Sequence, residues 1–163
     1  MTSPAPDVAT APVPLIVDVD GTLIKSDLLH ESVMQFAAHC PLELWRLVPW
    51  LAKGKQHLKC ELAESVTLDV SHMPLRAEVV DLIRAAQAEG RPVYLASASE
   101  VGLVQRMADR IGGIAGVFGT GRDQNVAGQA KAARLNAAFG EQGYDYVGDQ
   151  PVDFAVWQSS EAV

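Results

Sequence analysis

The chain has 163 residues, of which 48% are hydrophobic and 20% are charged, and its formal net charge is -7. This length is enough for one buried core with a modest insertion and too short for two full domains. The acidic balance argues against nucleic acid as the main partner, because binding to a phosphate backbone requires clustered Lys and Arg.

Residues 1–12 are rich in Pro, Ala, Ser and Thr, and we expect them to form a mobile leader outside the folded core. They lack the basic segment and the apolar run of a signal peptide. No apolar run in the chain reaches the length of about 18 residues that a transmembrane helix needs. Cys40 and Cys60 show no Cys-x-x-Cys spacing, which favours two reduced thiols and a cytoplasmic setting.

A buried strand is predicted at the start of the folded chain, where Leu15, Ile16 and Val17 form an apolar run. The sequence Asp-Val-Asp-Gly-Thr follows directly. Side chains two positions apart on a strand point the same way, so Asp18 and Asp20 should project together at its carboxyl end. Two like charges this close are costly unless a cation or a proton lies between them, which is the first indication of a functional site.

Short helical stretches are predicted between this strand and the next one. Ser26 could cap the first of them, and Pro49 should kink or end the second. We expect these stretches to form a small helical insertion over residues 25–73. Burial against the core is the default expectation for Trp45 and Trp50, although they could also form a surface for a partner.

After the insertion the chain alternates helices and strands, which predicts parallel crossover connections. Such connections bring the carboxyl ends of the strands to one sheet edge, where open α/β sheets bind their ligands. We therefore predict an α/β fold with a Rossmann-like parallel sheet flanked by helices, whose core consists of residues 13–24 and 74–163. The predicted elements are helix 75–89, strand 92–97, helix 100–111, strand 117–118, a helix that opens at Lys131, and strand 144–147.

Further polar residues fall at this same predicted edge. Ser97 ends the second strand, Lys131 opens a helix, and Asp149 and Asp153 follow the last strand. Taken singly, Ser97 could satisfy a local backbone group, Lys131 could be a solvated lysine, and Asp149 could belong to a turn. Their joint occurrence in this order favours a phosphoryl-binding metal site.

The motif Asp-x-Asp-Gly-Thr-Leu, followed in order by Ser97, Lys131 and Gly148-Asp149, resembles the haloacid dehalogenase-like (HAD) superfamily of phosphoryl-transfer enzymes. The resemblance implies that the helical insertion is a cap over the active site. Dehalogenases and ion-pumping ATPases of the superfamily lack a carboxylate at the position of Asp20. Its presence here favours phosphatase or phosphomutase chemistry.

Physical chemistry supplies roles for these residues. Asp18 is the candidate nucleophile, which would form an aspartyl-phosphate. Magnesium would reduce the repulsion between carboxylate and phosphate, with Asp149 as a further ligand and Asp153 in or just behind the coordination shell. Ser97 and Lys131 would donate to the phosphoryl oxygens. The family resemblance adds the backbone carbonyl of Asp20 as a metal ligand and its side chain as general acid and then base.

Asp27 and His30 are candidates for reading the substrate, because related phosphatases place polar residues there. The alternative is a helix-start carboxylate favoured by the helix dipole and an ordinary surface histidine.

A narrower resemblance, to the HAD domain that precedes UbiA-type membrane prenyltransferases, is carried by three segments. They are Thr22-Leu-Ile-Lys-Ser-Asp-Leu-Leu29, Leu95-Ala-Ser-Ala-Ser99 and Gly143-Tyr-Asp-Tyr-Val-Gly-Asp149.

The sequence thus predicts a magnesium-dependent phosphomonoester hydrolase that acts on a small phosphorylated metabolite. A phosphomutase is the alternative within enzymes. A catalytically idle docking or regulatory domain, associated with a membrane prenyltransferase, is the alternative from another class. A flavodoxin-like phosphoacceptor domain also uses Asp, Lys and magnesium, but it would have no use for a cap.

Overall fold

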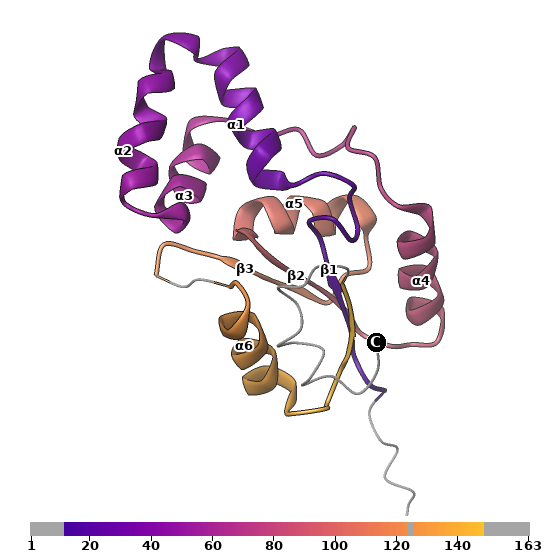
Figure 1. Ribbon diagram of the computed structural model, residues 1–163. Helices are drawn as coiled ribbons and strands as arrows, with labels where there is room; N and C mark the ends of the chain where they lie inside the picture. Colours follow the sequence, from indigo (N-terminus) through magenta and orange to yellow (C-terminus); the bar gives the residue numbers. More distant parts are fainter. Residues whose placement is uncertain (1–11, 124–125, 149–163) are drawn as a thin grey trace, which may run out of the picture.

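The computed structural model of the protein describes residues 12–123 and 126–148. In this part of the chain, four parallel strands form one sheet in the order β3-β2-β1-β4 (Figure 1). The strands are β1 (Leu15–Asp18), β2 (Val93–Glu100), β3 (Gly116–Thr120) and β4 (Asp145–Val147). The central position of β1 follows from its composition, since all four of its residues are buried.

Helices cover both faces of the sheet. Leu15 and Val17 of β1 belong to a core that includes α4 (Ala77–Ala88) and α5 (Val101–Ile111). Ile16 points to the opposite face and belongs to a core with α6 (Gln129–Phe139). This alternation along a single strand produces the three layers of the fold. The predicted fold class is confirmed.

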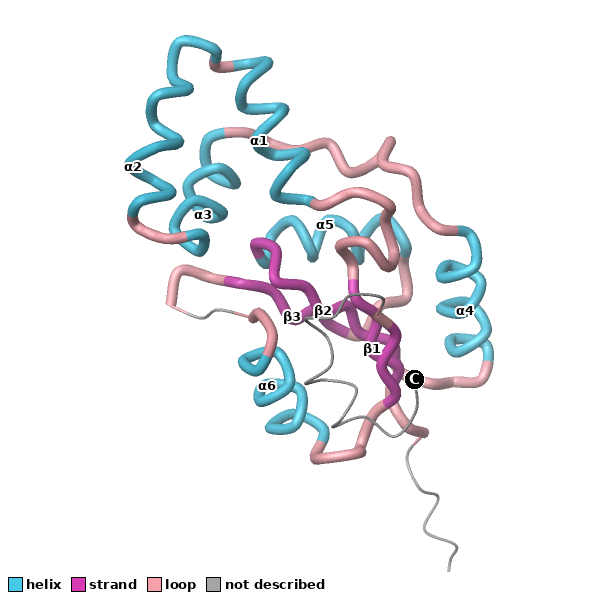
Figure 2. The backbone as a smooth tube through the Cα atoms, viewed as in Figure 1, coloured by secondary structure: helices cyan, strands magenta, loops and turns pink. Residues whose placement is uncertain are grey.

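A helical insertion follows β1, as predicted, and stands beyond the sheet edge at which β1 ends (Figure 2). It has a hydrophobic core of its own, in which the rings of Phe36 and Trp50 lie 5.5 Å apart. The boundaries 25–73 remain a prediction. The elements of the insertion are α1 (Leu28–His39), the 3-10 helix η1 (Pro41–Arg46), α2 (Leu47–Ala52) and α3 (Lys55–Ser65).

The first helix of the insertion is capped by Asp27, so the predicted cap at Ser26 is wrong. The Asp27 carboxylate accepts hydrogen bonds from the backbone N–H groups of Leu29 at 2.8 Å and His30 at 3.1 Å. Because α1 begins at Leu28, Asp27 and not Ser26 occupies the N-cap position, from which a side chain binds these N–H groups. The negative charge also suits the positive end of the helix dipole.

Pro49 does not end its helix, because α2 continues to Ala52, and a kink there remains a prediction. It is the third residue of α2, where the missing N–H has no intrahelical partner to lose.

The burial expected of both tryptophans holds for Trp50, which is 7% exposed, and fails for Trp45, which is 69% exposed. Trp50 faces α1 and α3, whereas no described element packs over the outer side of η1 and α2. Their other exposed apolar residues are Leu42, Leu44, Val48 and Leu51.

The helix predicted from Leu75 begins two residues later. Leu75 instead forms an isolated β-bridge with Ile24, which joins the chain leaving the insertion to the chain entering it. In this helix Leu82 is exposed, while Val79 and Ile83 supply buried contacts to the core. Among the described residues no helix is both long and apolar enough to cross a membrane.

The two tryptophans of the insertion offer a test of its core. We expect Trp50→Ala to reduce the free energy of unfolding by about 3–5 kcal/mol, because it leaves a cavity beside Phe36. The matched variant Trp45→Ala removes the same side chain from an exposed position, and its effect should stay within about 0.5 kcal/mol. Urea unfolding followed by far-ultraviolet circular dichroism measures both. Equal effects of the two variants would contradict the packing described here.

Candidate active site

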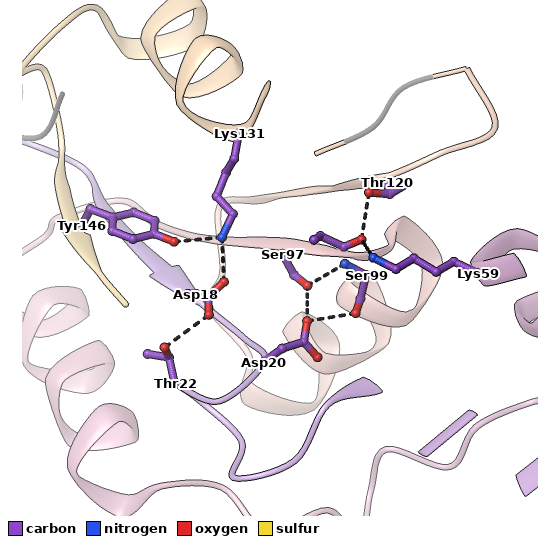
Figure 3. Close-up of polar contacts among 10 residues, drawn as sticks. Asp18, Asp20, Thr22, Lys59, Ser97, Ser99, Thr120, Lys131 and Tyr146 are labelled. Carbon is purple, nitrogen blue, oxygen red and sulfur yellow. Dashed lines mark hydrogen bonds and ion pairs between the residues drawn. The ribbon is translucent and has the colours of Figure 1, made fainter. Parts of the chain in front are cut away.

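Asp18 is buried at the carboxyl end of β1 and is held from two sides. One carboxylate oxygen accepts a hydrogen bond from Lys131 Nζ at 2.8 Å, and the other accepts one from Thr22 Oγ1 at 3.2 Å (Figure 3). Thr22 lies in the turn that follows the strand and Lys131 lies on α6. The apolar strand thus delivers a carboxylate into a polar pocket at the sheet edge.

The ion pair between Lys131 and Asp18 is almost dry, with side-chain exposures of 4% and 7%. Lys131 Nζ also donates to the hydroxyl of Tyr146 on β4, at 2.9 Å. Lys131 thus places a positive charge beside Asp18, and the magnesium ion expected between the two aspartates remains a prediction. Burial makes this pair sensitive to the loss of either partner, because the remaining charge would be left without compensation.

Asp20 lies beside this pair and is held by a different set of donors (Figure 3). Its Oδ1 accepts from the backbone N–H of Leu28 at 2.7 Å. Its Oδ2 accepts from the hydroxyls of Ser97 at 2.5 Å and Ser99 at 2.9 Å. Since Leu28 begins α1, this carboxylate joins the end of β1, the end of β2 and the start of the insertion.

The fold thus brings together four of the predicted site residues. Asp18, Asp20, Ser97 and Lys131 meet at the edge formed by the carboxyl ends of the strands. Ser97 is fully buried, and its hydroxyl contacts Asp20 and also accepts the backbone N–H of Ser99 at 2.8 Å. Its role as a donor to a phosphoryl group remains a prediction.

Comparisons with known proteins identify this architecture. No protein-family model matches the chain. The structure is similar to a substrate-bound phosphoserine phosphatase, with a TM-score of 0.64 at 11% identity, covering 94% of this chain and 86% of that one. It is also similar to an HAD-family hydrolase of Salmonella enterica serovar Typhi, with a TM-score of 0.61 at 14% identity, covering 92% and 61% of the two chains. The chain has the HAD hydrolase fold.

Two further proteins are similar to this chain, one in structure and one in sequence, and neither is described with an activity. A protein of unknown function from Bordetella pertussis Tohama I gives a TM-score of 0.66 at 19% identity, covering 91% of this chain and 87% of that one. The uncharacterized protein y4nM of Sinorhizobium fredii is 36% identical over 148 residues, which are 91% of this chain. The chain spans 28% of the length of y4nM.

The remaining predicted metal ligands, Asp149 and Asp153, lie outside the described residues. Within the described ranges, no group of three or more His, Cys, Asp or Glu residues is arranged to hold a metal ion. The described part of the HAD fold nevertheless offers carboxylate oxygens from Asp18 and Asp20, the donor type that magnesium prefers. These two side chains fit a magnesium ion in kind, and Asp149 and Asp153 as further ligands remain a prediction.

Asp27 and His30 lie at the start of α1, on either side of Leu28, whose backbone N–H binds Asp20. The Asp27 carboxylate caps α1 and His30 is exposed, which matches the structural alternative for these two residues. Contact of either residue with a substrate remains a prediction.

Sequence reasoning missed several residues that contact the site. Ser99 could have been found, because it lies two positions after Ser97 and so faces the same way on a strand. Thr22 and Tyr146 also contact the site residues, through Asp18 and Lys131. Nothing in the sequence marks Lys59, which reaches the site from α3. Burial lowers the pKa of the Lys59 ammonium group, while the carboxylates of Asp20 and Asp27 oppose that shift.

The buried ion pair predicts a distinctive pattern of stability. Lys131→Met should lower the free energy of unfolding by about 3–5 kcal/mol, because it leaves the Asp18 carboxylate buried without its cation. The double variant Asp18→Asn, Lys131→Met should be more stable than Lys131→Met alone, since no unpaired charge remains. A double-mutant cycle from urea unfolding measures this difference. A double variant with the summed loss of both single variants would contradict the pairing.

Proposed function

We propose that the protein is a magnesium-dependent phosphomonoester hydrolase that acts through an aspartyl-phosphate on Asp18. The observation that carries this proposal is the pair of carboxylates at the end of β1, each held by different partners. The ammonium group of Lys131 fixes the position of the Asp18 carboxylate through a hydrogen bond. The hydroxyls of Ser97 and Ser99 fix that of Asp20. Neighbouring carboxylates with separate environments suit a nucleophile and a proton-transfer group.

The reaction proceeds in two displacements. An oxygen of Asp18 attacks phosphorus, the bond from phosphorus to the leaving oxygen breaks, and protonated Asp20 gives its proton to that oxygen. Asp20, now ionised, takes a proton from a water molecule that attacks the phosphorus of the aspartyl-phosphate. The bond from phosphorus to Asp18 breaks, which releases inorganic phosphate and restores both carboxyl groups to their starting states.

Lys131 and Ser97 stabilise the transferring group. The ammonium of Lys131 is already beside the attacking carboxylate, so it can balance part of the charge on the phosphoryl oxygens without moving far. When the substrate is bound, the hydroxyl of Ser97 turns its single proton from Asp20 to a phosphoryl oxygen, while Ser99 keeps its hydrogen bond to Asp20. Because both groups are buried, their interactions with an anion are stronger than they would be in water.

The ligands of magnesium would be Asp18, the backbone carbonyl of Asp20, Asp149 and Asp153. The ion would neutralise part of the charge between carboxylates and phosphate. The register of the sheet supports this set, since Val147 of β4 pairs with Val17 of β1, one residue before Asp18. Asp149 follows Val147 by two positions in the sequence, the same short distance past a strand end at which Asp20 follows Asp18.

The substrate class that we propose is a small phosphorylated metabolite. A helical insertion stands beyond the site edge, and Asp27 and His30 at the start of α1 are our candidates for reading the leaving group. The fold is similar to that of phosphoserine phosphatase, so phosphoserine belongs in any panel of test substrates.

A docking role is the second candidate, and it is favoured by one observation. The chain spans 28% of y4nM, so a similar domain also occurs within a longer protein. A catalytically idle domain associated with a membrane prenyltransferase would bind such a partner without releasing phosphate. A phosphomutase, in contrast, would return the phosphoryl group to a substrate and would also release little inorganic phosphate.

The first test is hydrolysis of p-nitrophenyl phosphate in the presence of magnesium, with release of inorganic phosphate as the readout. We expect Asp18→Asn to reduce the rate to background, because an amide cannot form the aspartyl-phosphate. Asp20→Asn should lower the rate by about 10²–10⁴-fold, because no general base then takes the proton from the water that hydrolyses the aspartyl-phosphate. Asp81→Asn, on the exposed surface of α4, removes the same charge and should have no effect.

Failure of the wild-type protein to release phosphate from a broad panel of phosphomonoesters, including phosphoserine, would contradict this function. Retention of activity by Asp18→Asn would exclude the aspartyl-phosphate route.

The second test addresses the metal. Treatment with EDTA should abolish hydrolysis, and added magnesium should restore it. Asp149→Asn should raise the magnesium concentration for half-maximal activity by at least about tenfold, because it removes a charged ligand. Asp81→Asn again serves as the control. Full activity in EDTA, or an unchanged magnesium requirement in Asp149→Asn, would contradict the proposed ligand set.

A further inference from the structure

A single backbone carbonyl, that of Ala98, links the helical insertion to the residues that hold Asp20. It accepts hydrogen bonds from Thr120 Oγ1 at 2.9 Å and from Lys59 Nζ (Figure 3). Thr120 ends β3 and Lys59 lies on α3 of the insertion. The core and the insertion therefore meet at the same oxygen atom.

This carbonyl is available because the sheet is irregular here. The pairing of β2 with β3 shifts register between Ala96 and Glu100, so the segment between them leaves the regular ladder. Ala98 is half-buried, and a carbonyl that leaves both the ladder and part of the solvent needs other donors. Side chains of Lys59 and Thr120 supply them.

The residues on either side of Ala98 are the two serines that bind Asp20. Both hydroxyls donate to Asp20 Oδ2, and the backbone N–H of Ser99 donates to Ser97 Oγ. The orientation of Asp20 is therefore tied to the conformation of this short segment. Any group that fixes the Ala98 carbonyl also fixes the two hydroxyls.

The side chain of Lys59 lies between the insertion and the core. Its side chain lines a small cavity between insertion and core, together with Ser32 of α1 and Ser99 of β2. Burial lowers the pKa of its ammonium group, and the nearby carboxylates of Asp20 and Asp27 oppose that shift. The ammonium group is thus partly desolvated, which costs free energy unless a hydrogen bond or an opposite charge compensates it. The Ala98 carbonyl supplies that hydrogen bond.

We propose that Lys59 is a positioning residue that acts from the insertion on Asp20 through the Ala98 carbonyl. It holds the segment from Ser97 to Ser99 in the geometry in which Asp20 can protonate the leaving oxygen. This inference rests on the proposed hydrolase function and deepens it, because it makes the acid dependent on a residue of the insertion. No contact between Lys59 and the phosphoryl group is required.

The test compares two substrates of similar shape whose leaving groups differ in their need for an acid. Nitrophenolate leaves without protonation, whereas phenol is a poorer leaving group and depends on the proton from Asp20. Lys59→Met should therefore lower kcat/KM for phenyl phosphate about tenfold more than kcat/KM for p-nitrophenyl phosphate. Lys59→Leu, which also lacks a donor, should give the same change, and it serves if the methionine variant does not fold. Lys55→Met, one helical turn earlier on α3 and exposed, should leave the ratio unchanged.

The outcomes separate this inference from the function on which it rests. A change in the substrate ratio confined to the Lys59 variants supports the positioning role. An equal loss for both substrates, or no loss, overturns the positioning role and leaves the hydrolase function standing. If the wild-type protein hydrolyses neither substrate with magnesium present, the function is overturned and this inference with it.

Discussion

The buried ion pair between Lys131 and Asp18 is the interaction on which the site depends. It joins residues 113 positions apart in the sequence and brings α6 to the end of β1. Two charges removed from water are costly, and their attraction offsets this cost only when geometry and further hydrogen bonds are good. Thr22 and Tyr146 supply those hydrogen bonds, so the turn after β1 and the strand β4 are fixed by the same pair.

The second carboxylate has a different function in the architecture. Asp20 accepts the first backbone N–H of α1 and the hydroxyls of two serines on β2, so it connects the insertion to the sheet. Lys59 adds another connection, because this lysine of α3 donates a hydrogen bond to the backbone carbonyl between those serines. The placement of the insertion and the orientation of Asp20 are thus coupled through short polar contacts, and a change in either one should affect the other.

Much of the fold followed from local patterns. The apolar run of β1 and the alternation of helices and strands predicted a parallel sheet, and they predicted that Asp18, Asp20, Ser97 and Lys131 would meet at one edge. Parallel crossovers leave little freedom in where strand ends fall, which is why the prediction succeeded. The exposure of Trp45 was not predicted, because its apolar character says nothing about whether another element covers it.

By itself, the sequence determined which chemical groups this protein has and the order in which strands present them. Residue type and spacing decide these features locally, through side-chain alternation and helix periodicity. Only the tertiary structure decided which partner each group has: Lys131 for Asp18, Ser99 for Asp20 and Lys59 for the Ala98 carbonyl. Those pairs lie 113, 79 and 39 positions apart, and contacts over such separations depend on how elements pack.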